Sequence, residues 1–131
     1  MKRALFIVFL LIGKAALSQT QFEMNQQAHA AYQKADKELN TVYRKILLLY
    51  KADTVFIANL KESQRLWIKF RDAEVKMKYP AREAGFYGSV HPLCWSNYLE
   101  QLTYQRTEKL REWLKGDEEG DVCAGSAVIK G

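Results

Sequence analysis

Apolar residues recur with a helical period along most of the chain, and they divide it into three amphipathic segments. The first spans about residues 21–50, where apolar positions return every three or four residues from Ala28 to Tyr50 and charged residues occupy the other face. The second spans about residues 55–78, and the third about residues 90–115. None of them shows the strict alternation that is typical of a half-buried strand. The pattern therefore predicts an all-α protein with three long helices.

Capping residues and short connections indicate how these helices are joined. Asp53 or Thr54 can cap the second helix by accepting a hydrogen bond from a free backbone N–H group, and Ser89 can do so for the third. Gly116 is placed to end the third helix in a left-handed conformation. Short connections favour antiparallel neighbours that bury their apolar stripes together. We therefore expect an antiparallel three-helix bundle with an irregular loop, residues 81–90, between helices two and three.

The start of the chain has the organisation of a secretion signal. Lys2 and Arg3 precede an unbroken apolar run, residues 4–12. Ala16 and Ser18 are small residues at the two positions that a signal peptidase recognises. A membrane-spanning helix needs about 20 apolar residues, so this run is short for a retained anchor, which is the alternative. The expected organisation is a cleaved signal peptide at residues 1–18, a helical domain at 19–116, and an acidic, loosely ordered C-terminal tail at 117–131.

Removal of the signal would change the net charge of the protein. The whole chain carries 20 Lys and Arg and 15 Asp and Glu, a formal net charge of +5. Lys2, Arg3 and Lys14 would leave with the signal, so the mature chain would carry 17 basic and 15 acidic residues, or +2. So small a net charge attracts polyanions weakly. We therefore expect a periplasmic or secreted protein with no nucleic-acid partner and no stable membrane insertion after cleavage.

Two cysteines, Cys94 and Cys123, would remain in the mature chain. Because export exposes thiols to an oxidising compartment, a disulfide between them is a candidate cross-link. It would close a loop of about 30 residues, and the chain-entropy model gives such a bridge roughly 3–4 kcal/mol. The alternative is two free or intermolecular thiols.

Polar residues interrupt the apolar stripes of all three helices at helical spacing. They are Asp36 and Asn40 in the first helix, Gln64, Trp67 and Arg71 in the second, and Arg106 in the third. One interpretation is that they line a groove that a partner fills. The other is that a carboxylate or amide of the first helix binds an arginine of another helix and fixes their register. We favour the second, because partly buried charges need partners and the planar guanidinium suits a carboxylate.

The sequence contains no recognisable catalytic or metal-binding set. His29 and His91 lack companions at ligand spacing. His91 and Cys94 could form a thiolate–imidazole pair, but an oxidising compartment disfavours a free thiolate there. Gly85 and Gly88 lack the lysine and hydroxyl of a phosphate-binding loop. We therefore predict that the protein is not an enzyme and uses no metal and no cofactor.

Aromatic residues near the loop are the remaining candidates for a binding surface. Phe86 and Tyr87 lie in the loop, and Trp95 lies near the start of the third helix. If exposed together, they would resemble the aromatic anchors that dominate the energy of protein–protein interfaces. The other interpretation, which we favour, is that these rings pack onto the helix ends.

The order and spacing of several motifs resemble the bacterial LprI-type lysozyme-inhibitor-like domain family. The motifs are Met24-Asn25-Gln26, Tyr32, Ala35-Asp36, Glu38-Leu39-Asn40 and Tyr43; then Gln64, Trp67 and Phe70-Arg71-Asp72-Ala73-Glu74; then Gly88-Ser89, Leu102-Thr103, Arg106-Thr107 and Leu110. Together they cover about residues 22–114, which is nearly the whole mature chain.

This resemblance implies an exported helical protein that binds lysozyme and inhibits it by steric occlusion, without catalytic residues. A cell-envelope interaction or structural module with another bacterial protein partner, and without lysozyme activity, is the alternative function. Lysozymes of the common animal type are basic, and opposite charges speed association. The acidic tail, with its run from Asp117 to Asp121, is the patch that offers such a charge.

Overall fold

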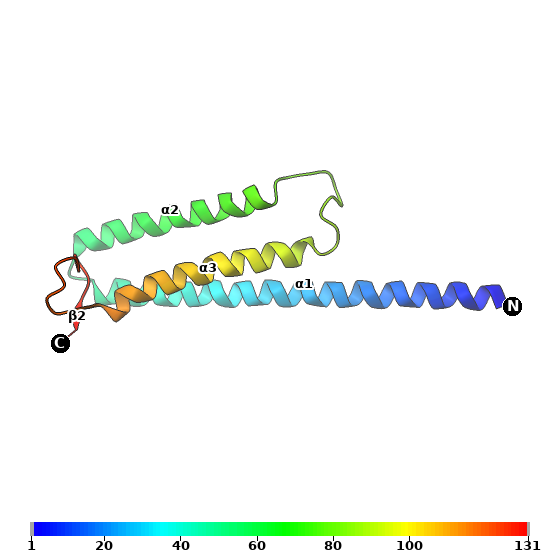
Figure 1. Cartoon of the computed structure of the whole chain (residues 1–131), viewed down its shortest axis with the longest axis horizontal. Helices are drawn as coiled ribbons and strands as arrows, with labels where there is room; N and C mark the ends of the chain where they lie inside the picture. The colour runs from blue at the N-terminus through cyan, green and yellow to red at the C-terminus, as the bar shows by residue number, and fades with distance from the viewer. Residues whose placement is uncertain (1, 131) are drawn as a thin grey trace.

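The computed structural model describes the backbone of residues 2–130 and the side chains of residues 18–130. The elements are α1 (Lys2–Leu49), α2 (Thr54–Lys78), α3 (His91–Lys115), β1 (Asp117–Glu118) and β2 (Ile129–Lys130). Consecutive helices run in opposite directions, and α2 and α3 lie along the C-terminal half of α1 (Figure 1). The all-α three-helix architecture predicted from the apolar period is therefore confirmed.

Helix α1 is longer than the sequence pattern predicted. It continues without a break through Ser18 and Gln19, where cleavage of a signal peptide is expected. The predicted signal, residues 1–18, lies outside the described side chains apart from Ser18. Within the described part of the chain, no helix offers an apolar stretch long enough to cross a membrane. Removal of residues 1–18 stays a prediction.

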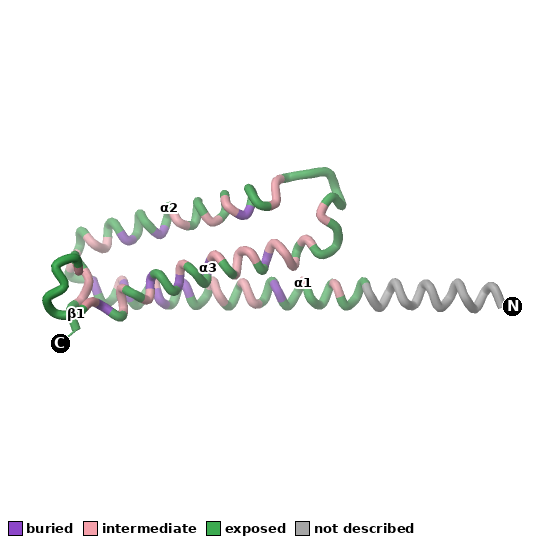
Figure 2. The backbone as a smooth tube through the Cα atoms, in the orientation of Figure 1, coloured by how far each residue is buried: buried purple, intermediate pink, exposed green. Residues whose placement is uncertain are grey.

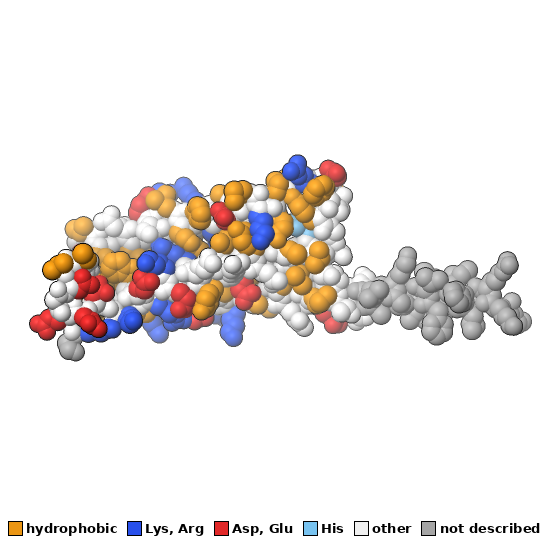
Figure 3. Space-filling model, in the orientation of Figure 1, with side chains coloured by type: hydrophobic (Ala, Val, Ile, Leu, Met, Phe, Trp, Pro, Cys, Tyr) orange, Lys and Arg blue, Asp and Glu red, His pale blue; other side chains and the backbone are white. Residues whose placement is uncertain are grey.

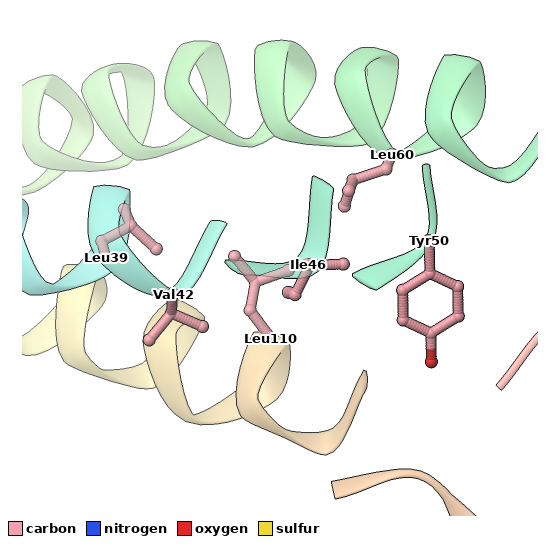
Figure 4. Close-up of a cluster of buried hydrophobic side chains, with 6 residues drawn as sticks. All are labelled: Leu39, Val42, Ile46, Tyr50, Leu60 and Leu110. Carbon is pink, nitrogen blue, oxygen red and sulfur yellow. The ribbon is translucent and has the colours of Figure 1, made fainter. Parts of the chain in front are cut away.

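The hydrophobic core lies where the last part of α1 meets α3 and the first part of α2. It consists of Leu39, Val42 and Ile46 from α1, Tyr50 directly after α1, Leu60 from α2 and Leu110 from α3 (Figure 4). Helices α1 and α3 pack closely, whereas α2 lies at an angle to them and is mostly exposed or half-buried (Figure 2). Helix α2 therefore depends on long side chains, such as Phe56 and Trp67, to reach the core.

One of the predicted helix caps is confirmed and one is wrong. The Asp53 carboxylate accepts a hydrogen bond from the Phe56 N–H group at 2.9 Å, as expected for the start of α2. Helix α3 begins after Val90, which has no side-chain capping bond, so Ser89 is not the cap. The backbone carbonyl of Ser89 instead accepts a hydrogen bond from the side chain of Asn25 at 3.0 Å, which ties the loop to α1.

The C-terminal tail is folded back onto the bundle, which differs from the expected loose order. Strand β1 pairs in parallel with β2, and the Asp117 N–H group donates to the Val128 carbonyl at 2.9 Å. The hydroxyl of Tyr50 donates to the Trp113 carbonyl at 2.8 Å and accepts from the Val128 N–H group at 3.0 Å. The hydroxyl of the buried Tyr50, directly after α1, therefore anchors the tail, and residue composition alone does not show this contact.

The backbone conformation of Gly116, which ends α3, leads to a testable prediction about this tail. Its φ of 71° is positive as expected, but its ψ of 178° is extended, a combination that is almost restricted to glycine. A β-carbon there would also lie within 2.8 Å of Val128 Cγ2. We expect Gly116→Ala to speed hydrogen exchange of the Val128 amide by about tenfold or more, because this strain costs about 1–3 kcal/mol. Gly85→Ala is the matched control.

Gly85 has a φ of 83° and open space around its α-carbon, and it lies in the other loop. Gly85→Ala therefore introduces a similar backbone strain without a contact to the tail, and exchange at Val128 should not change. Equal exchange rates in the wild type and Gly116→Ala would show that Gly116 does not hold the tail in place.

Candidate functional site

The polar residues singled out in α1 and α2 meet at the interface between these helices. The guanidinium of Arg71, whose side chain is only 11% exposed, lies 3.6 Å from an Asp36 carboxylate oxygen and 2.9 Å from one of Asp72. Its Cζ atom is 6.0 Å from the ring centroid of Tyr32 on α1, and 5.3 Å from that of Trp67 on α2 itself. Asn40 donates to the backbone carbonyl of Asp36 at 2.9 Å. Arg71 therefore connects α2 to α1 through charge and aromatic packing together.

The polar residues of α3 connect to α2 separately. Arg106 donates from Nε to Oε1 of the buried Gln64 at 3.0 Å, and from Nη2 to the Ser63 hydroxyl at 3.0 Å. Its Cζ atom is 5.9 Å from the Trp67 centroid, so this ring contacts guanidinium groups of two helices. Five of the six candidates thus take part in contacts between helices, whereas the hydrogen bonds of Asn40 go to Asp36 on its own helix.

The loop between α2 and α3 lies at the end of the two helices that it joins (Figure 1), and aromatic rings of the loop and of both helix ends form a cluster there. The cluster, called here the aromatic cluster, consists of Tyr79, Phe86, Tyr87, His91, Trp95 and Tyr98. The rings of Phe86 and Tyr87 lie 4.9 Å apart, and Tyr87 stacks on His91 at 4.6 Å. Trp95 lies 5.8 Å from His91. The three predicted surface residues therefore belong to one continuous set of rings.

This cluster borders an open depression of about 620 Å³. Phe86 is 57% exposed at its edge, whereas Tyr87 and Trp95 are half-buried. Figure 3 shows hydrophobic side chains and a histidine gathered at this end of the molecule, with charged groups at its tip. The depression is concave and is lined partly by aromatic side chains. Both are features of a binding surface for another molecule.

Hydrogen bonds and cations hold the cluster in place. The Tyr87 hydroxyl donates to the Pro80 carbonyl at 2.7 Å, which closes the loop, and Tyr98 donates to Glu74 at 3.1 Å. The Lys78 ammonium lies 3.9 Å from the Tyr98 centroid, and Arg82 lies 5.7 Å from that of Phe86. The cations Lys78 and Arg82 therefore lie at the rim of the cluster, together with the Glu74 carboxylate.

Tyr79 and His91 are residues of this cluster that the sequence interpretation missed. Burial, followed by the nearby Cys94, raises the pKa of the Tyr79 phenol. A signal for His91 was present, because it lies one turn before Trp95 on the same face of α3. The sequence interpretation treated His91 as a candidate metal ligand, a base or a surface residue. The structure shows instead that its ring packs on Tyr79, Tyr87 and Trp95.

The predicted disulfide between Cys94 and Cys123 is wrong for this structure, in which both thiols are free. Cys94 lies in the first turn of α3, and Cys123 lies beyond its last residue. At 1.5 Å per residue, α3 separates them by about 30 Å, whereas a disulfide requires α-carbons within about 7 Å. Sequence separation could not show that a straight helix fills most of the loop to be closed.

The described side chains offer binding contacts. Among residues 18–130, the structure places no three histidine, cysteine or carboxylate side chains close enough to hold a metal ion. His91 borders the depression, but the half-buried Cys94 is not among the residues that line it. The aromatic and cationic groups at the loop can contact another molecule through stacking and charge.

The fold and these surfaces define the class: a small all-helical protein with an aromatic loop at the end of a three-helix bundle. Residues 13–110 match the family described as Lysozyme inhibitor LprI. The chain is also 32% identical over 113 residues to "Uncharacterized protein R02472" of Rhizobium meliloti (strain 1021), which covers 76% of this chain and 77% of that protein. No solved structure matches.

The chain belongs to the Lysozyme inhibitor LprI family. The resemblance that the motifs indicated is therefore confirmed. The family match extends from residue 13, within the predicted signal, to Leu110 in the core of α3. It includes the polar interhelical contacts and the aromatic cluster but ends before the folded tail.

Proposed function

We propose that this protein is exported, loses residues 1–18, and inhibits a lysozyme by inserting the aromatic cluster into its substrate cleft. The observation that carries the proposal is the projecting loop, with an exposed Phe86 ring beside Arg82, in a chain of a lysozyme-inhibitor family. Inhibition would need no chemistry on the inhibitor, because an occupied cleft excludes the glycan. The protein is then a binding protein and not an enzyme.

Electrostatics support the loop as the contact surface. Lysozymes cleave glycan with a pair of carboxyl groups inside the cleft, even where the enzyme as a whole is basic. The rim of the aromatic cluster carries Lys76, Lys78 and Arg82, and its acidic neighbours are Glu83 and the hydrogen-bonded Glu74. Cations beside flat apolar rings are complementary to such a cleft. The acidic tail lies at the other end of α3. If the loop occupies the cleft, the tail faces the basic outer surface of the lysozyme.

Residues 19–131 can be tested by titration into a lysozyme cell-lysis assay. We expect the wild type to slow lysis and Phe86→Ala to raise the half-inhibitory concentration at least tenfold, because exposed aromatic anchors contribute about 2 kcal/mol or more at interfaces. Tyr104→Ala is the matched control, since Tyr104 is 61% exposed on α3 and lies outside the cluster. Unchanged lysis at high micromolar excess of wild type would exclude inhibition of that lysozyme.

A second candidate function is an envelope interaction module whose partner is another bacterial protein. The observation that favours it is an apolar stripe on the outer face of α2, where Leu66 is 51%, Phe70 60% and Met77 70% exposed. These residues share one helix face and contact no other helix in the core. Capture of an envelope protein that is lost in Phe70→Glu but kept in Phe86→Ala would identify this function instead.

A further inference from the structure

A groove between α2 and α3 lies at the opposite end of these helices from the aromatic cluster. It has a volume of about 290 Å³, and Phe56, Leu60, Leu110 and Trp113 form its apolar wall. On α3, Arg106 of the groove follows Trp95 of the cluster by eleven residues, so about 16 Å of helix separates the two surfaces at their nearest edges. Any ligand of this groove is therefore independent of the proposed binding to lysozyme.

The polar side of the groove contains a guanidinium without a carboxylate partner. Arg106 makes hydrogen bonds to Gln64 and Ser63, which are both uncharged. Within the part of the chain that the structure describes, Arg65, Arg71 and Arg111 each form an ion pair, and Arg106 forms none. Burial lowers the pKa of Arg106, which reflects the cost of holding this charge away from water.

This arrangement suits a carboxylate from outside the chain. A guanidinium has five N–H donors, and two of them bind Gln64 and Ser63, so others stay free for an anion. Charge-assisted bonds from arginine to a carboxylate are about twice as strong as neutral ones. Lys109 lines the same groove and adds positive charge, although it also pairs with Glu112 at 2.8 Å.

We propose that the groove binds a short acidic segment of a protein partner, with a carboxylate on Arg106 and a neighbouring apolar side chain against Trp113. Its volume fits side chains, not a folded domain, so the occupant is a peptide segment. The charge selects Asp or Glu over a neutral residue, and the aromatic wall selects Leu or Phe beside it. Partners with isolated acidic residues lack the apolar contact and bind more weakly.

The test uses two tripeptides and the wild-type protein. Both peptides are acetylated and amidated and contain one polar residue between leucine and phenylalanine. That residue is glutamate in the first peptide and glutamine in the second. We expect saturable NMR shifts of the Trp113 indole and Arg106 Nε signals, with the glutamate peptide binding at least tenfold more tightly. Equal binding of the two peptides, or no saturable shift with either, would overturn the proposal.

Two variants and a control show whether the NMR shifts arise from binding in this groove. Arg106→Gln should remove the preference for glutamate, whereas Arg44→Gln, an exposed arginine on α1, should keep it. Because Arg106 also joins two helices, Asn59→Trp is a second variant that fills the groove from an exposed lining position. It should weaken the glutamate peptide at least tenfold while Arg106 is still present. Unchanged binding in Asn59→Trp would place the peptide elsewhere and refute the site.

Discussion

Ile46→Ala is expected to lower the free energy of unfolding by about 2–5 kcal/mol, the range for removing a large aliphatic side chain from a packed core. Ile46 is fully buried, with 0% of its surface exposed, at the centre of the cluster that joins all three helices. Its neighbours Leu60 and Leu110 come from α2 and α3, so a cavity there weakens both helix contacts with α1. Global stability, not local order, should therefore fall.

Urea denaturation followed by circular dichroism at 222 nm measures this effect directly. The matched control is Leu48→Ala, two residues away on the same helix, because Leu48 is 71% exposed. The control should change stability by about 0.5 kcal/mol or less. The melting temperature of Ile46→Ala should fall by about 10 °C or more. Equal losses in the two variants would mean that the three-helix core is not packed as described.

The core around Ile46 was predictable because helical periodicity is a local property. Leu39, Val42 and Ile46 recur at three- and four-residue spacing, and burial of one face is what that spacing requires. The same logic gave the bundle and the position of α2 to within one residue. The tail was not predictable, since its order depends on a hydroxyl of Tyr50 that lies 78 residues before Val128. A long-range contact of a single side chain produces no periodic pattern in the sequence.

Some members of the candidate site were predictable from the sequence, namely Phe86, Tyr87 and Trp95, but Tyr79, His91 and the arrangement of the rings were not. The aromatic cluster joins the end of α2 to the start of α3. Pro80 disfavours a helical conformation at Tyr79, so α2 ends there, and the Tyr79 ring packs on the ring of Tyr87. The sequence identified Trp95 as aromatic but could not show how much of it is exposed. Arg106 was assigned to the interhelical contacts, and its lack of an acidic partner became visible only from geometry.

The weak contact of α2 with the rest of the bundle determines the importance of Arg71. Helix α2 has few buried side chains, namely Leu60, Gln64 and Val75. Between them it depends on Trp67 and Arg71 to reach the other helices. A contact that would be secondary in a tightly packed bundle is therefore a main connection between α2 and α1 here.

Arg71→Ala is expected to destabilise the protein by about 1–3 kcal/mol and to lower its melting temperature by about 5–10 °C. Most of this comes from packing of the guanidinium on Trp67 and on Tyr32, at 5.3 and 6.0 Å from the ring centroids. The ion pair with Asp36 contributes less, because it is 3.6 Å long and the carboxylate side chain is 41% exposed. Asp36→Asn alone should therefore cost about 1 kcal/mol or less.

Three variants separate these contributions by thermal unfolding. Arg65→Ala is the matched control, since Arg65 pairs with Glu62 on the exposed face of the same helix and should change the melting temperature little. Arg71→Lys keeps the charge but loses the planar group, so it should recover only part of the stability. An unchanged melting temperature in Arg71→Ala, together with loss of partner binding, would instead support the interpretation in which Arg71 lines a groove that a partner fills. Loss of stability with lysozyme inhibition retained below the lowered melting temperature would assign Arg71 to the register of α1 and α2.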